Sequence, residues 1–248
     1  MQSRFLRPLL APLLSMVFLV APLASWASFE EGEKAYEQAD YWNAFRAFLP
    51  LAKEGHVPSQ AMLGKVYFFG NGAPLDGRAS ADWYQRAASK GHATAQFELG
   101  RMYAAGIGVP KDAKRAAELM EQAANQRLPW AMHAIGGMYL QGSGVTKSEV
   151  QAYKWYSLAI AEPETPASAD FIRLAKAAKA ELDKTLSADD VREANKLAAE
   201  WRAKAKPVDP QWLRPVNLPN GARPVATNFD PNVSKRSREM TDGYFPKE

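Results

Sequence analysis

The sequence predicts an all-α protein in which pairs of short helices repeat along the chain and stack into a solenoid. Three observations predict it. The chain matches itself when shifted by 36 residues, because MLGKVYFFGNG (62–72), ELGRMYAAGIG (98–108) and AIGGMYLQGSG (134–144) align without a gap. Each copy has apolar residues at helical spacing. Each copy also ends its first helical run at a pair of glycines.

Residues 1–27 are expected to be a cleaved secretory signal peptide rather than part of the fold. Two arginines precede an apolar stretch that ends in Ser25-Trp26-Ala27, which places small residues before a cleavage site after Ala27. A membrane anchor is the alternative interpretation. It is weaker because Pro12 and Pro22 interrupt the stretch, which is shorter than the ~20 residues that span a bilayer.

The composition narrows the class of protein. The chain has 248 residues, 47% of them hydrophobic, and no cysteine. An exported protein without disulfides fits a bacterial periplasm, so we expect a periplasmic or secreted protein with no integral membrane segment after cleavage. The net charge of +4 falls to +2 without Arg4 and Arg7. A surface of mixed charge is therefore expected, and nucleic acid is not an expected partner.

Residues 28–56 are expected to form N-terminal cap helices. The stretch DYWNAFRAFLPLAKEGH (40–56) resembles the second helix of a repeating unit. It ends at Gly55-His56, as another such helix ends at Gly91-His92.

Three repeats follow, with expected bounds of 57–92, 93–128 and 129–164. The first helix of each is expected over about 59–69, 94–105 and 130–141, and the second over about 77–89, 113–125 and 149–161. A residue with a side-chain oxygen caps each second helix: Asp76, Asp112 and Ser148. In the third repeat, Gln151 is expected to complete a capping box with Ser148.

Glycines mark two places in each repeat. An interior glycine costs a helix roughly 1 kcal/mol relative to alanine, so its recurrence at Gly64, Gly100 and Gly136 predicts close approach to the neighbouring helix. The glycine pair after each first helix is interpreted as a helix stop. A phosphate-binding loop is the alternative, but Lys111 occupies the position of the third glycine in GxGxxG.

Residues 165–206 are expected to form C-terminal cap helices. SADFIRLAKAAKAELDKTL (168–186) places apolar residues on one stripe. SADDVREANKLAAEW (187–201) begins with a capping-box signal at Ser187 and Asp190.

Residues 207–248 have a different composition. They hold seven prolines and no helical periodicity, so a linker or a disordered tail is expected. The tail contains aromatic residues that could dock on the solenoid or on a partner: Trp212, Phe229, Tyr244 and Phe245.

The order A-x-L-G-x-x-Y-x-x-G-x-G, then a capped helix with W-Y-x-x-A-A, resembles the Sel-like repeats, which are related to tetratricopeptide repeats. The resemblance covers roughly residues 35–203. The matching positions of the first unit are Ala61, Leu63, Gly64, Tyr67, Gly70, Gly72, Asp76, Trp83, Tyr84, Ala87, Ala88 and Gly91. One departure is Leu119-Met120 in place of Trp-Tyr. The resemblance implies a right-handed solenoid with a concave surface and a role as an adaptor.

No motif predicts an enzyme. His56, His92 and His133 lack the spacing of metal ligands, and we expect them to be structural. Asp76 and Asp112 are interpreted as caps rather than as an acid–base pair. We therefore expect no catalytic residue, no cofactor and no metal, and a protein partner from envelope assembly. Two alternatives stay open: an immunity protein that neutralises a toxin from rival bacteria, and, in another class, a hydrolase of envelope polymers.

A candidate binding face follows from helical spacing. Positions 63, 64 and 67 are expected to pack internally, so positions 62, 65 and 69, with their equivalents in the later repeats, lie on the opposite side. These positions vary between repeats, as a specialised surface would, although ordinary solvated variation is the alternative. With Trp130, a typical interface anchor, the candidate partner-binding residues are Met62, Lys65, Phe69, Glu98, Arg101, Trp130 and Gln141.

Overall fold

The computed structural model describes residues 21–205, with side chains described from residue 29. The predicted tail and residues 1–20 of the predicted signal peptide lie outside this part. Over residues 21–205 the chain forms ten α-helices and no strand. They are α1 (Ala21–Glu37), α2 (Tyr41–Lys53), α3 (Val57–Phe69), α4 (Gly77–Ser89), α5 (Ala93–Ala105), α6 (Ala113–Asn125), α7 (Pro129–Gln141), α8 (Glu149–Ala161), α9 (Ala169–Thr185) and α10 (Ala188–Lys204). None of these helices is long and apolar enough to cross a membrane.

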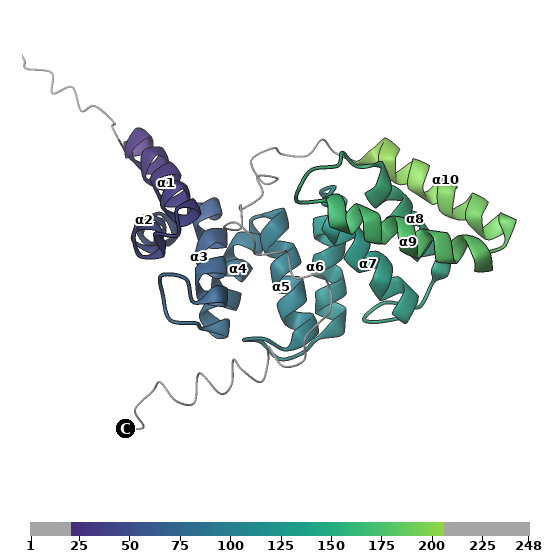
Figure 1. Ribbon diagram of the computed structural model, residues 1–248. Coiled ribbons are helices and arrows are strands. Elements are labelled where there is room, and N and C mark those ends of the chain that lie inside the picture. The colour runs from purple at the N-terminus through teal and green to yellow at the C-terminus, as the bar shows by residue number, and fades with distance from the viewer. Residues whose placement is uncertain (1–20, 206–248) are drawn as a thin grey trace, which may run out of the picture.

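The helices form a linear array (Figure 1), in which each helix from α1 to α8 packs on the next in sequence. Direct contacts of α3 with α5, and of α7 with α9, place the first helices of successive pairs in one row. The predicted all-α solenoid is confirmed. The core follows the array as three apolar clusters: residues of α5 to α10 contribute to the largest, and two smaller clusters lie toward α1.

The predicted caps set where the second helices begin. The Asp76 carboxylate accepts from the amides of Arg78 and Ala79 at 2.9 and 3.0 Å. The Ser148 hydroxyl accepts from the Gln151 amide at 3.2 Å. The amide of Ser148 donates to the Tyr139 carbonyl at 2.9 Å. The capping box predicted at Ser148 is therefore only half formed. The Ser148 amide donates to the Tyr139 carbonyl and not to the Gln151 side chain.

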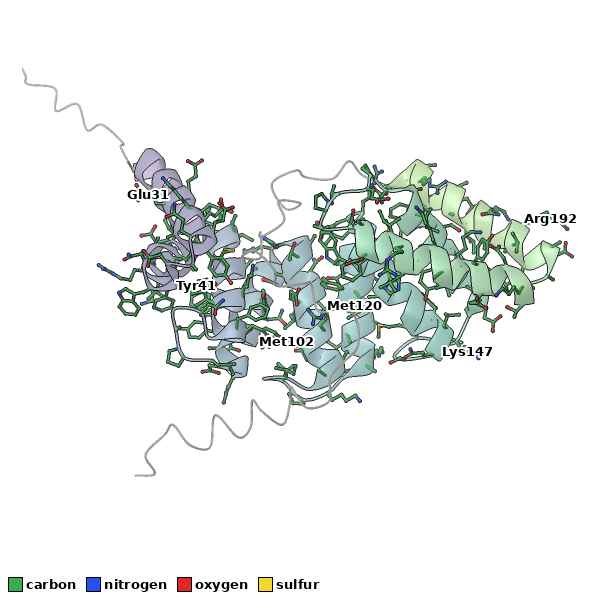
Figure 2. The ribbon with its side chains drawn as sticks, in the orientation of Figure 1. Glu31, Tyr41, Met102, Met120, Lys147 and Arg192 are labelled. Atoms are coloured by element: carbon green, nitrogen blue, oxygen red, sulfur yellow. The ribbon has the colours of Figure 1, made fainter. Side chains whose placement is uncertain are left out.

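The interior glycines lie where the two helices of a repeat touch. A Cβ added at Gly64 would lie 2.6 Å from the Tyr84 ring, and one at Gly136 would lie 2.7 Å from the Tyr156 ring. In the second repeat the neighbour of Gly100 is Met120, at 3.0 Å. Figure 2 marks Met120 in the middle of the array. The predicted close approach is confirmed in all three repeats.

The two glycines of each loop have different roles. The first, such as Gly106 with a φ of 75°, caps the first helix in the left-handed conformation. The second contacts the backbone of the preceding helix pair: an added Cβ at Gly108 would collide with the Gly77 carbonyl, and one at Gly72 with the Tyr41 carbonyl. The interpretation as a helix stop therefore holds for the first glycine only. The second glycine joins neighbouring repeats.

Helices α1 and α2 form a shortened repeat. A Cβ added at Gly32 would lie 2.6 Å from the Phe48 ring, the same contact that Gly64 makes with Tyr84. Phe48 precedes Tyr84 by 36 positions, whereas Gly32 precedes Gly64 by 32. The loop between α1 and α2 is therefore four residues shorter than the loops of the later repeats.

The C-terminal helices close the array against α8. The Tyr153 hydroxyl of α8 donates to Asp183 of α9 at 2.8 Å. Helix α10 packs on α8, and its Trp201 indole donates to Asn125 at the end of α6 at 2.7 Å. The last turn of α10 thus lies beside the middle of the solenoid.

Candidate binding face

The candidate face consists of one stripe on the first helix of each repeat, and we call it the first-helix face. Its positions recur at helical spacing along α3, α5 and α7, so side chains of one stripe lie on one side of each helix. Its residues are Met62, Lys65 and Phe69 on α3, Glu98, Arg101 and Ala105 on α5, and Trp130, Ala134, Gly137 and Gln141 on α7.

The exposure predicted for two of these residues is wrong. Met62 is 3% exposed and Lys65 is 8% exposed. Met62 packs in the apolar cluster that contains the buried Tyr36 of α1, and the Lys65 Nζ lies 4.7 Å from the centre of the Tyr36 ring. Burial lowers the pKa of Lys65 to about 8, and the Glu98 carboxylate opposes that shift. Helix α1 therefore covers the first-helix face at the first repeat.

The second repeat presents a charged part of the face. The Arg101 guanidinium donates to the Glu98 carboxylate at 2.8 Å, and both side chains are half-buried. Arg101 also lies 5.9 Å from the centre of the Phe97 ring. These contacts hold the two charges in a fixed arrangement, with part of each side chain facing solvent.

The third repeat presents an aromatic residue beside small ones. The half-buried Trp130 ring lies 6.4 Å from the Phe171 ring of α9. Gly137 lies seven residues after Trp130 on the same helix. A Cβ added at Gly137 would meet only the Tyr156 hydroxyl, at an ordinary van der Waals distance of 3.8 Å. Gln141 is exposed at the end of α7. The α7 backbone is therefore open to close approach at Gly137.

The most exposed large apolar side chains between residues 29 and 205 are Trp42 at 61% and Phe69 at 47%. Sequence reasoning selected Phe69 but missed Trp42. The repeat register contained the signal, because Trp42 occupies the position that holds Arg78 and Lys114 in the next two units.

Two of the three histidines make hydrogen bonds near helix starts, and the ring of the third, His133, lies 5.7 Å from the Tyr156 ring. His92 is 7% exposed, and its Nδ1 accepts from the Ala95 amide at 3.2 Å, which caps α5. Burial lowers the pKa of His92 to about 4. His56 Nδ1 lies 2.8 Å from the Ser59 hydroxyl. No group of three His, Asp or Glu side chains within the described residues is arranged to hold a metal ion.

A family of repeat proteins matches the helix pairs of this array. The Sel1 repeat family matches residues 57–92, 93–128 and 131–162. No curated protein matches the chain. One similar solved structure is a protective antigen of uropathogenic Escherichia coli that displays an SLR fold. It is 24% identical with a TM-score of 0.49, over 76% of this chain and 47% of the antigen.

Another similar structure is a Sel1 repeat protein from Oxalobacter formigenes, which is 33% identical with a TM-score of 0.45. That match covers 51% of this chain and 94% of the other. Sel1 repeat proteins generally mediate protein–protein interaction and are typically non-catalytic scaffolds. Through the three matched units, which coincide with the helix pairs α3–α4, α5–α6 and α7–α8, this chain belongs to the Sel1 repeat family.

Proposed function

We propose that this chain is an exported adaptor of the bacterial envelope that binds a protein partner on the α5 and α7 part of the first-helix face. One observation carries the proposal. The framework positions repeat from unit to unit, whereas the stripe changes from an ion pair at Glu98 and Arg101 to a bare backbone at Gly137. Such variation on a constant framework is typical of a surface shaped for one partner.

Recognition on this face requires little ordering of the adaptor. The stripe lies on helices that pack on both sides, so the partner meets a preformed surface. Trp130 offers an aromatic anchor, and the open backbone at Gly137 accepts a closely approaching partner segment. The predicted concave surface would place these contacts inside the curve of the solenoid.

Export is the second part of the proposal. The predicted signal peptide and the absence of cysteine support a periplasmic location, and a component of envelope assembly is the partner class that this location favours. Phe69 is assigned to another surface, described below, because α1 covers its neighbours Met62 and Lys65.

The test is a crosslinked pull-down of the exported protein from the periplasm, with Gly137→Arg as the probe. Arginine is the residue of the second repeat at this position, Arg101, and a Cβ fits at Gly137 without a clash. The control is Gln122→Arg, an exposed position on the second-helix row. We expect one dominant partner that Gly137→Arg loses and Gln122→Arg keeps.

Other outcomes contradict parts of the proposal. Equal retention by both variants refutes the face. A tight complex with one toxin identifies an immunity protein instead of an adaptor. Turnover of peptidoglycan or polysaccharide by the purified protein, lost on substitution of a single carboxylate, identifies a hydrolase and overturns the proposal.

A further inference from the structure

An aromatic patch lies at the N-terminal end of the array, where α2 begins and α3 ends. We define it as Trp42, Phe45, Tyr67 and Phe69. The Trp42 and Phe45 rings are stacked 6.2 Å apart, and Phe45 lies edge-on to Tyr67 at 6.0 Å. Figure 2 shows Tyr41, the neighbour of Trp42, at this end of the molecule.

Trp42, Phe45 and Tyr67 form a row of ring contacts across the two helices, and Phe69 lies on the other side of the last turn of α3. The loop after Phe69 returns to the first turn of α2, since an added Cβ at Gly72 would lie 3.2 Å from the Trp42 amide nitrogen. Trp42 and Phe69 therefore flank one short stretch of backbone. Both side chains are large, apolar and exposed at the same end of the array, which is the kind of surface that a partner or another segment of the chain covers.

The patch is specific to this end of the solenoid. The position of Trp42 holds Arg78 and Lys114 in the next two units, and the position of Phe69 holds Ala105 and Gln141. The fold therefore accepts polar or small residues at both positions. Nothing in the repeat framework requires the aromatic residues there.

We infer that the aromatic patch is covered by residues 229–247 of the same chain. This segment contains Phe229 and the pair Tyr244-Phe245, and it carries four cations and three carboxylates, with three of the cations grouped in the run 233–238. Residues 29–40 carry five carboxylates and one lysine, and Asp40, which caps α2, precedes Trp42 by two residues. The aromatic residues of the segment thus match the aromatic patch, and its cationic run matches the acidic stretch 29–40 that leads into α2.

The length of the chain beyond α10 permits this contact. The contact of Trp201 with Asn125 places the end of α10 beside α6. From α6 to α2 the distance is four interhelix spacings, roughly 40 Å in all, and one helix length adds about 20 Å. Phe229 follows Ala205 by 24 residues, a reach of up to roughly 80 Å, whereas Trp212 follows by seven, roughly 25 Å. Phe229 can therefore reach the patch, and Trp212 cannot.

Because the segment and the patch belong to one chain, even a contact of low affinity is occupied for much of the time. A segment held on the same chain is present at an effective concentration on the order of millimolar. The contact does not depend on the proposed partner face, because Gly137 lies on the third repeat and the patch lies before the second.

The test is limited proteolysis of the full exported chain by trypsin, with cleavage after Lys235, Arg236 and Arg238 followed by mass spectrometry. The patch variant combines Trp42→Arg with Phe69→Ala, both of which are residues that other units carry at these positions. The control is Gln141→Ala, at the position equivalent to Phe69 two units later. We expect cleavage about tenfold faster in the patch variant and unchanged in the control. Circular dichroism confirms that both variants fold.

A photo-crosslinker at position 69 provides the second measurement. We expect crosslinks to residues 229–247 of the same chain, at a yield independent of protein concentration. Equal cleavage rates in all three proteins overturn the inference. Crosslinks that form only between two copies also overturn it and identify a second molecule as the occupant.

Discussion

Acid should destabilise the fold through His92. Its pKa is about 4 in the folded protein and 6.5 in its ordinary state, because burial disfavours the charged imidazolium. The neutral Nδ1 accepts the Ala95 amide and caps α5, and a protonated ring cannot accept that bond. Below pH 6.5 the unfolded chain binds a proton here that the folded chain does not. Stability contributed by the neutral ring is therefore lost as the pH falls from about 6.5 toward 4.

The magnitude follows from the two pKa values. Between pH 7.5 and pH 5, preferential protonation of the unfolded state lowers the free energy of unfolding by about 2 kcal/mol. The full difference, reached below pH 4, is about 3 kcal/mol. For a protein of this size, 2 kcal/mol corresponds to a fall in Tm of roughly 4–8 °C. His56 and His133 add to the loss, because burial also lowers the pKa of both.

The assay is thermal and urea unfolding, followed by circular dichroism between pH 7.5 and pH 5, of three proteins. They are the parent, His92→Asn, and His92→Leu, which copies Leu128 at the equivalent cap of α7. Asparagine keeps a capping oxygen and does not titrate, so we expect parental stability at pH 7.5 and a smaller loss at pH 5. Leucine also removes the titration but loses the cap, which costs about 1 kcal/mol at every pH. Equal acid sensitivity of the parent and His92→Asn would refute the reasoning.

Three further predictions concern packing and caps, each measured by urea unfolding. Gly64→Ala should destabilise the fold by about 1–3 kcal/mol, because its Cβ would lie 2.6 Å from a buried ring. Gly137→Ala should stabilise the fold by up to about 1 kcal/mol, because the space there is open. Equal effects of the two substitutions would contradict this difference in packing. Asp112→Ala should cost about 1 kcal/mol and Asp112→Asn much less, because the carboxylate caps α6 at 2.9 Å. Lys65→Glu should destabilise by about 3 kcal/mol or more, since it buries a carboxylate near Glu98, and a neutral effect would contradict the burial.

The helices were predictable because their ends are encoded locally. Asp76 and Asp112 accept from amides two or three residues ahead, and Gly106 closes α5 through a bond to the Met102 carbonyl four residues behind. Signals of this kind need no knowledge of the rest of the fold. Each of these local signals recurs every 36 residues, so the arrangement of the helices in pairs was also predictable from the sequence.

Exposure was less predictable, because it depends on what covers a face. Helical spacing correctly places Met62 and Lys65 on one stripe, but Tyr36 of α1 lies over Lys65. Helix α1 carries its packing glycine at Gly32, four residues out of the repeat register, so the self-alignment does not reveal it as a first helix. The accessible part of the candidate face therefore lies on α5 and α7, where Glu98 and Gly137 are half-buried and not fully buried.

The two glycines of each loop recur together in the sequence, but the sequence does not show that they have different roles. Gly106 and Gly108 are two residues apart and recur together, yet one satisfies the end of its own helix and the other contacts the preceding repeat. The second contact joins backbone to backbone, at the Gly77 carbonyl, so no side chain reveals it. A residue without Cβ is needed there only once two repeats are stacked. The period thus encodes the interface between units as well as the units themselves, which is why each repeat depends on its neighbours for stability.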